Sequence, residues 1–172
     1  MDEALLKQLY QKYHKELYLY LLTLCKSKEV AEDILQETFL KAILSLSESH
    51  TNMRAWLYMV ARNLCFNYIK KEKRRNELDE LSSGAVNEAD VLENVLEHEK
   101  NRMLCKALEN IDHTKREVLT LQYFCGLSQK EIAATLRLSP ENVRILSYRG
   151  KKELRKFLEE NGYDISWITW FI

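Results

Sequence analysis

The sequence predicts an all-α protein of two small helical domains joined by a flexible acidic linker, and three observations support this fold class. The 172 residues include only four Gly and one Pro, too few turn residues for a chain of β-hairpins. Apolar residues recur every three or four positions over most of the chain, as on one face of a helix. That periodicity stops over residues 76–90, which contain a Ser-Ser-Gly run at 82–84.

Two helices are predicted before residue 47. The first covers residues 5–24, and its apolar face consists of Leu5, Leu6, Leu9, Tyr13, Leu17, Tyr20, Leu21 and Leu24. The second begins after Ser27, and the acidic residues near the positive end of its dipole are Glu29, Glu32 and Asp33. Its expected buried side consists of Ala31, Ile34, Leu35, Phe39, Ala42 and Leu46.

A polar loop over residues 45–52 leads to a third helix of about twenty residues. Its expected core stripe is Leu57, Val60, Ala61, Leu64 and Tyr68, and its basic end contains Lys70, Lys71, Lys73, Arg74 and Arg75. The stripe leaves Trp56 on an adjoining face, beside Arg62, Asn63 and Asn67. An exposed Trp in such company can stack on an unpaired base while an Asn hydrogen-bonds the base edge. The alternative is that Trp56 simply belongs to the core.

The last third of the chain has the sequence form of a helix-turn-helix. The run 128–131, Ser-Gln-Lys-Glu, is a Ser-x-x-Glu capping box, and Gly126 suits the end of the preceding helix. Ser139 supplies a second cap, with Pro140 at the first helical position. Two short helices separated by a turn of three to four residues are typical of this motif, whose second helix enters the major groove of DNA.

The zero net charge is a cancellation between segments of opposite sign. Residues 54–75 carry seven basic side chains and one acidic side chain, and residues 100–156 carry thirteen and six. Residues 76–99 carry eight acidic side chains and no Lys or Arg. The two basic segments therefore predict binding to a polyanion, with strong salt dependence.

The helix after Pro140 is the predicted reader of duplex DNA. Its buried side is expected to come from Val143, from Leu146 or Ser147, and from Leu154. The residues then expected to face the major groove are Asn142, Arg144, Ile145, Tyr148 and Arg149.

No feature predicts catalysis, a cofactor or a metal site. The four Cys residues lie in separate predicted helices without a C-x-x-C pair, and the four His residues are scattered. The chain has no Gly-rich phosphate loop and no nucleophile motif. It opens Met-Asp-Glu, unlike a signal peptide, and its most apolar run, 17–25, is far shorter than the roughly 20 residues that span a bilayer. We expect a cytoplasmic protein that is not an enzyme and does not insert into a membrane.

Three segments, in this order, resemble the extracytoplasmic-function (ECF, group IV) sigma factors of bacterial RNA polymerase, which belong to the sigma-70 family. AEDILQETFLKA (31–42) is similar to the polymerase-binding part of their region 2. RAWLYMVARNLCFNYIKKEKRR (54–75) resembles the part that melts the promoter and reads the −10 element. REVLTLQYFCGLSQKEIAATLRLSPENVR (116–144) is similar to region 4, which reads the −35 element. The resemblance implies an alternative sigma factor that binds core RNA polymerase and directs promoter recognition, DNA melting and transcription initiation.

The resemblance also implies the organisation of the chain. Residues 1–75 would form region 2 as a three- to four-helix bundle, 76–98 the acidic linker, 99–160 region 4 with its helix-turn-helix, and 161–172 an apolar C-terminal tail. Its implied partners are core RNA polymerase, single-stranded −10 DNA, duplex −35 DNA and, as a family expectation, an anti-sigma factor.

Site residues follow position by position from the resemblance. Core polymerase would be bound by Asp33, Gln36, Glu37 and Lys41. The −10 DNA would be contacted by Trp56, Arg62, Asn63, Asn67, Lys70 and Lys71. Asn63 would read a flipped base, beside a pocket formed by the loop Ser47–Arg54. The −35 DNA would be contacted by Asn142, Arg144, Ile145, Tyr148, Arg149 and Lys152.

Several alternatives stay open at this point. Ile145 stands where the family commonly has a polar residue, so either it packs on a thymine methyl or the helix is rotated in its domain. The tail 163–172 either packs back on the protein or enters a partner, because its aromatic residues would otherwise be exposed. The rival functions are a helix-turn-helix transcriptional regulator that is not a sigma factor, and an adaptor that binds polymerase without opening DNA.

Overall fold

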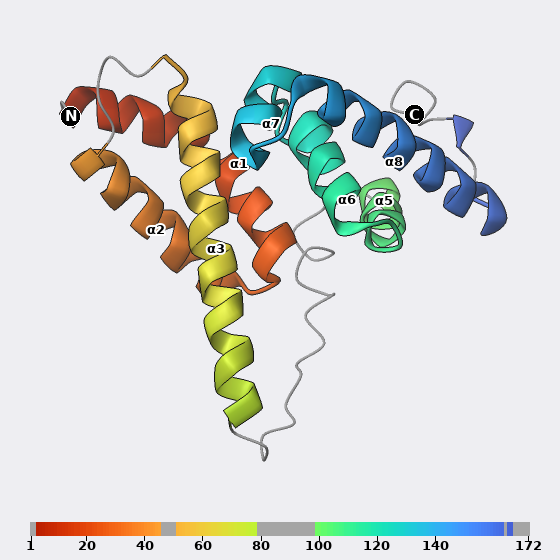
Figure 1. The fold of residues 1–172 in the computed structure, drawn as a ribbon, viewed down its shortest axis with the longest axis horizontal. Helices are drawn as coiled ribbons and strands as arrows, with labels where there is room; N and C mark the ends of the chain where they lie inside the picture. Colours follow the sequence, from red (N-terminus) through yellow and green to blue (C-terminus); the bar gives the residue numbers. More distant parts are fainter. Residues whose placement is uncertain (1–2, 46–50, 79–98, 164, 167–172) are drawn as a thin grey trace. The chain divides into compact units, whose positions relative to one another are not determined.

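The computed structural model describes residues 3–45, 51–78, 99–163 and 165–166, and the regular elements within these ranges are all helices. The chain divides into two compact units, residues 1–92 and 93–172. The first contains α1 (Glu3–Cys25), α2 (Lys28–Ser45) and α3 (Met53–Leu78) (Figure 1). The second contains α5 (Glu99–Glu109), α6 (His113–Leu119), the π-helix η1 (Thr120–Phe124), α7 (Gln129–Leu136) and α8 (Pro140–Glu160). The prediction of an all-α chain is confirmed.

The three helices of the first unit pack pairwise against one another around a shared core. α1 contributes Leu17, Tyr20 and Leu21, all fully buried, and the Tyr20 ring lies 5.3 Å from the ring of Tyr58 in α3. On α2 the predicted side is buried at every described position, whereas residue 46 lies outside the described ranges. Thr38 is buried as well, and its Oγ1 donates to the carbonyl oxygen of Ile34 at 2.7 Å. This hydrogen bond offsets the cost of burying a hydroxyl group.

The core stripe predicted for α3 is partly wrong. Leu57 and Ala61 are buried as expected, but Val60 and Leu64 are half-buried and Tyr68 is exposed. The buried positions that the prediction missed are Ala55, Tyr58 and Cys65. Residues 55–66 are apolar around most of the helix circumference, so periodicity alone does not define one buried face. Packing against both α1 and α2 decides it.

α3 is also longer than predicted. It contains 26 residues and continues past the expected start of the linker at residue 76. Its C-terminal part extends beyond α1 and α2 (Figure 1), and residues 70–77 are almost all exposed there. Lys, Arg and Glu are good helix formers, and an i,i+3 ion pair joins Arg75 to Glu72 at 3.2 Å. The expected resumption of helix near residue 89 lies outside the described residues, and α5 begins at Glu99.

The start of α3 is fastened to α1 by an arginine. The backbone N–H of Ala55 donates to Oδ1 of Asn52 at 3.0 Å, which caps the helix. Arg54 then makes a bidentate ion pair with Glu16, with distances of 3.2 Å from Nε and 3.0 Å from Nη2. The Arg54 guanidinium also lies 5.7 Å from the Tyr13 ring centroid. The two side chains of this pair are only about one-fifth to one-quarter exposed. The pair therefore anchors the first turn of α3, and with it the end of the preceding loop, to α1.

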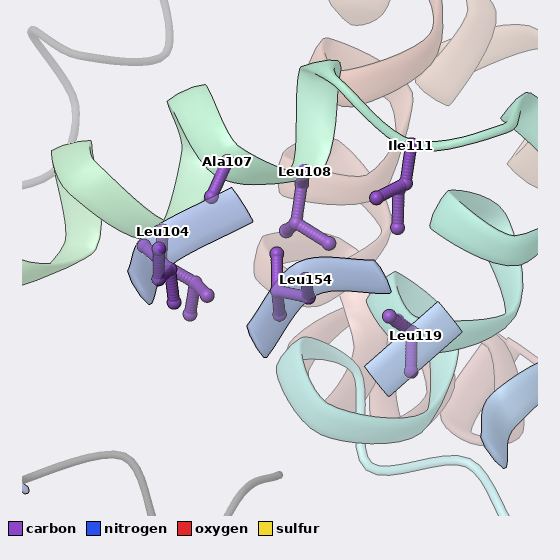
Figure 2. Close-up of a cluster of buried hydrophobic side chains, with 7 residues drawn as sticks. Leu104, Ala107, Leu108, Ile111, Leu119 and Leu154 are labelled. Atoms are coloured by element: carbon purple, nitrogen blue, oxygen red, sulfur yellow. The ribbon is translucent and has the colours of Figure 1, made fainter. Parts of the chain in front are cut away.

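The second unit has a compact apolar core between α5, α6 and α8. Figure 2 shows the side chains that converge there. The buried members are Leu104, Ala107, Leu108, Ile111, Leu119, Leu154 and Leu158. At the end of α8 the chain reverses at Gly162, whose φ is +71°, and the Tyr163 N–H donates to the Leu158 carbonyl at 3.0 Å. Tyr163 and Ile165 then pack against this core, so these two tail residues fold back on the protein, whereas residues 167–172 lie outside the described ranges.

The helix caps predicted for the helix-turn-helix are confirmed. At the start of α7, Ser128 Oγ accepts the N–H of Glu131 at 3.3 Å and the Glu131 carboxylate accepts the N–H of Ser128 at 2.8 Å. Ser139 Oγ accepts the N–H of Asn142 at 3.2 Å at the start of α8. Between the two helices, Arg137 adopts the left-handed conformation, with φ 57° and ψ 45°. A glycine would reach this conformation without the steric cost that Arg137 bears.

Cysteine placement partly follows the prediction of small apolar residues. Cys65 and Cys125 are buried and Cys25 is half-buried. Cys125 follows η1 instead of lying inside a helix, and the side chain at position 105 is not described. Within the described ranges, no group of His, Cys, Asp and Glu is arranged to hold a metal ion. The described helices include none that is both long and apolar enough to cross a bilayer.

Candidate functional site

The predicted protein-binding residues share the exposed side of α2. Asp33, Gln36, Glu37 and Lys41 are all exposed, because the opposite side of the helix packs against α1 and α3. Lys41 Nζ lies 3.7 Å from Glu37 Oε1, in an i,i+4 pair whose two side chains are about half exposed. Such a pair in water contributes little to stability. The structure thus brings these four side chains together on one surface where a partner can reach them.

A hollow of about 490 Å³ runs between α2 and α3 beside this surface. It is lined by Glu29, Val30, Asp33, Ile34, Glu37, Leu64, Asn67, Tyr68 and Lys71. Acidic groups therefore come from α2, and Asn67, Tyr68 and Lys71 come from α3. Sequence reasoning placed Tyr68 in the core and so missed it as a surface residue; it is 38% exposed. Nothing in the local pattern distinguishes the two roles, because the packing of α2 on α3 sets the rotation of α3.

Tyr18 on α1 lies near the acidic side of α2. Burial raises the pKa of Tyr18, and the negative charges of Glu32 and of an ionised Cys25 raise that pKa further.

The predicted −10 residues form a line along α3. Trp56, Asn63, Asn67 and Lys70 follow one another at spacings of seven, four and three residues, which places them above one another on one side of a helix. Trp56 and Asn63 are half-buried and Asn67 is exposed, so the expectation of an exposed Trp56 is only partly met.

The remaining predicted −10 residues flank this line. The guanidinium of Arg62 lies 4.6 Å from the ring centroid of Phe66, a cation–π contact that positions Arg62 beside the Asn63 side. Lys71 belongs to the basic C-terminal end of α3, and its side chain is exposed. Of the loop Ser47–Arg54 that was expected to complete the pocket, residues 47–50 lie outside the described ranges, and Arg54 is held by Glu16.

The predicted −35 residues all lie exposed on α8. They are Asn142, Arg144, Ile145, Tyr148, Arg149 and Lys152. Tyr148 is 69% exposed. A hollow of about 520 Å³ adjoins them, lined by Gln122, Gln129, Arg144, Ser147, Tyr148, Lys151, Lys152 and Arg155. Four of the lining residues are basic and none is acidic, so the hollow suits a phosphate group.

Sequence reasoning missed the polar residues that come to this hollow from other elements. Gln122 belongs to η1 and Gln129 to the first turn of α7. Lys151 Nζ lies 4.9 Å from the Tyr123 ring centroid, which holds this lysine along the η1 side of α8. Basic composition could have indicated Lys151, but only the packing of η1 on α8 brings Gln122 to the site.

The sequence left open whether Leu146 or Ser147 is buried on the inner side of α8, and the rotation of α8 in its unit decides this. Ser147 is buried and Leu146 is half-buried. Ser147 Oγ donates to Oε1 of Gln122 at 2.7 Å. One turn further on, a Cβ atom on Gly150 would lie 3.1 Å from Leu119 Cδ1 and 3.2 Å from Lys115 Cβ. Small residues at 147 and 150 therefore let α6 and η1 approach α8, and Ile145 points away from them.

Two family models match the chain, one in each unit. The Sigma-70 region 2 model matches residues 9–75, and the Sigma-70 region 4 model matches residues 102–154. The region 2 match covers the bundle that carries the α2 and α3 surfaces. The region 4 match covers most of α5, all of α6, η1 and α7, and most of α8. A helix-turn-helix regulator outside the sigma factors would account only for the second match.

Relatives and solved structures agree with these matches. The chain is 30% identical over 149 residues to the ECF RNA polymerase sigma factor SigM of Bacillus subtilis, covering 86% of this chain and 91% of SigM. It is 30% identical over 165 residues to SigX of the same organism, covering 91% and 85%. The sigma factor RpoE of Bartonella quintana, solved in complex with the anti-sigma factor NepR, superposes with a TM-score of 0.72 at 22% identity over 89% of this chain and 96% of RpoE. CnrH, solved with the cytosolic domain of CnrY, gives 0.67 at 23% identity over 94% and 92%.

The two structures share the fold, and the two sequence relatives share the family. The same two regions occur in the same order in this chain, on helices with the surfaces described above. The chain therefore belongs to the ECF sigma factors, the alternative sigma factors that direct RNA polymerase in transcription initiation.

Proposed function

We propose that the three exposed surfaces divide the work of initiation, and that the α2 surface binds core RNA polymerase. Asp33, Gln36, Glu37 and Lys41 supply two carboxylates, an amide and an ammonium group on one side of a well-packed helix. Charged and amide groups on a rigid helix favour a specific polar interface with a complementary partner. The Glu37–Lys41 ion pair is exposed enough to exchange its partners when polymerase binds.

The α3 line binds the opened −10 strand. A captured base needs an aromatic or apolar surface to stack on and an amide to read its edge, and Trp56 and Asn63 offer both on one side of α3. Asn67, Lys70 and Lys71 continue toward the exposed basic end of the helix, where Lys side chains can follow the strand's phosphates. Arg62 flanks the base-reading position through its contact with Phe66.

The outward side of α8 binds duplex −35 DNA. Its N-terminal half carries Asn142, Arg144 and Arg149, side chains that donate hydrogen bonds to purine edges in the major groove. The cationic hollow with Lys152 adjoins this side and provides for the phosphate backbone. The single observation that supports this proposal most strongly is the outward exposure of all six predicted −35 residues on one capped, well-packed helix.

Catalysis is not part of the proposal, because core polymerase performs nucleotidyl transfer. The chain acts in the cytoplasm, where polymerase and the promoter are found. Its activity is restrained by an anti-sigma factor, the class of protein that is bound to the sigma factor RpoE of Bartonella quintana in its solved structure. No membrane insertion of this chain is required.

A run-off transcription assay with purified core polymerase and a promoter library tests the proposal. Glu37→Lys should weaken binding to core polymerase about tenfold or more, since it places a cation in an anionic contact. Glu160→Lys is the control, because Glu160 also forms an i,i+4 ion pair, with Lys156 at 3.6 Å, at the far end of α8, and that pair is more exposed than the Glu37–Lys41 pair. Failure to initiate at any library promoter would refute the proposed function.

The division of labour is tested by a second pair of variants. Asn63→Ala should slow promoter opening about tenfold, because one edge contact to a captured base is lost, while polymerase affinity stays within about twofold. Asn76→Ala, at an exposed position further along α3, is its control. Permanganate reactivity of −10 thymines reports opening, and fluorescence anisotropy reports polymerase binding. Equal losses of polymerase affinity in Asn63→Ala and Glu37→Lys would contradict separate roles for α2 and α3.

A further inference from the structure

The centre of the outward side of α8 is an isoleucine. The inward side is the line of Val143, Ser147, Gly150 and Leu154, all buried. At 3.6 residues per turn, Ile145 lies on the opposite side of the helix from this line. Its side chain is 44% exposed. Ile145 therefore contributes little to the core of its own domain, and its exposed apolar surface is available to contact the partner that α8 binds.

Packing on the inner side of α8 leaves the helix little freedom to rotate, and this keeps Ile145 on the outward side. Ser147 is tied to Gln122 by the 2.7 Å hydrogen bond between their side chains. Gly150 has no room for a larger side chain against Leu119. Turning α8 to bury Ile145 would break that hydrogen bond and push larger side chains into these two close approaches, at the cost of overpacking.

The neighbours of Ile145 make it chemically distinct on this surface. Tyr148 and Arg149 lie three and four residues further along, so they are its immediate neighbours on the helix face. Arginine reads the acceptors of guanine, and Tyr148 offers a hydroxyl group. The side chain of Ile145 has no hydrogen-bond donor or acceptor. If it packed against a polar base edge, it would exclude water from that edge and leave the base's donor or acceptor without a hydrogen bond. The thymine methyl is the apolar group that the major groove offers.

We propose that Ile145 is a specificity-determining residue that packs on the C5-methyl group of a thymine in the −35 element. This inference rests on the proposed −35 role of α8 and names part of its sequence preference. Four helical residues rise about 6 Å and one base step rises about 3.4 Å, so the thymine lies within about two base pairs of the base that Arg149 contacts.

Replacing thymine by deoxyuridine tests the contact, because it deletes only the methyl group. Promoters are selected from a template library randomised in the −35 element, using core polymerase with the full-length chain. Each −35 thymine of a selected promoter is then replaced singly by deoxyuridine on either strand. One replacement should lower holoenzyme affinity for the promoter about fourfold, as expected for the loss of one buried methyl group. In the Ile145→Ala variant the same replacement should have no effect, and Ile145→Val should retain most of it.

The control and the contrary results are distinguishable. Ile43→Ala removes an isoleucine of similar exposure, 39%, from α2 and should keep the full deoxyuridine effect whatever its overall activity. Initiation that ignores deoxyuridine at every −35 thymine would overturn the inference and leave the sigma-factor function intact. A deoxyuridine effect that survives in Ile145→Ala would also overturn it, since another residue would then read the methyl group. No initiation from any thymine-containing template would refute the proposed function itself and the inference with it.

Discussion

Leu154→Ala should destabilise the second unit far more than the first. Leu154 is fully buried on α8 among the leucines of α5 and α6 (Figure 2). The substitution deletes three carbon atoms, which costs roughly 2.4 kcal/mol in transfer free energy at about 0.8 kcal/mol each. A residual cavity adds to this loss, and buried Leu→Ala changes reach about 3–5 kcal/mol. A unit of this size is stabilised by only about 4–12 kcal/mol, so much of its free energy of unfolding would disappear.

Urea unfolding followed by hydrogen exchange of individual peptides measures this effect in the full chain. With a slope of about 1–3 kcal/mol per molar urea, the midpoint for peptides of α5–α8 should fall by at least about 1 M. Peptides of α1–α3 should keep their midpoint. Leu44→Ala makes the same deletion at a side chain that is 83% exposed and should change stability by less than about 0.5 kcal/mol. A loss below about 1 kcal/mol for Leu154→Ala, or equal losses of protection in both units, would refute the reasoning.

Three further substitutions test local features of the helix-turn-helix unit. Arg137→Gly should raise its stability by about 0.5–1 kcal/mol and its Tm by about 4 °C, because glycine adopts φ 57° without steric cost; calorimetry checks this, and an unchanged Tm contradicts it. Gly150→Ala should lower stability by about 1 kcal/mol despite a better helix propensity, because its Cβ would meet fully buried Leu119 at 3.1 Å; a stabilised variant would show that Leu119 can move. Thr135→Val should stabilise α7 by about 1 kcal/mol, since the buried Thr135 Oγ1 has no hydrogen-bond partner among the described residues; a loss in urea unfolding would indicate a polar contact there.

Much of the fold follows from interactions that reach only three or four residues along the chain. The Ser128 capping box and the Ser139–Pro140 start are legible because each side chain satisfies the backbone of its own helix. The buried side of α2 is legible for a related reason, since its apolar residues from Ala31 to Ala42 recur every three or four positions, although Leu40, Ile43 and Leu44 of the same helix are exposed. The exposed positions of the residues predicted to bind polymerase on α2 follow from this spacing, whereas their role came from the family resemblance.

The residues that were misplaced lie where a helix is apolar around most of its circumference or where a distant residue intervenes. Tyr68 looked like core because it continues an apolar spacing, yet α1 and α2 cover the side of α3 that carries Tyr58 and Cys65. Arg54 looked like part of a loop pocket, but Glu16, 38 residues earlier, binds it. Neither outcome is encoded within one turn of the residue concerned.

The sequence by itself determined the helical class, the helix ends around the turn at Arg137, and the uneven distribution of charge, because propensity, capping and composition are properties of short segments. Tertiary structure alone decided which side of α3 faces outward and, on α8, that Ser147 and not Leu146 is buried. On α8 that choice depends on Gly150 against Leu119 and on Ser147 against Gln122, contacts between elements distant in the chain. Rotation of a helix is set by the closest approach that its smallest side chains permit, and this approach exists only once the helices are packed together.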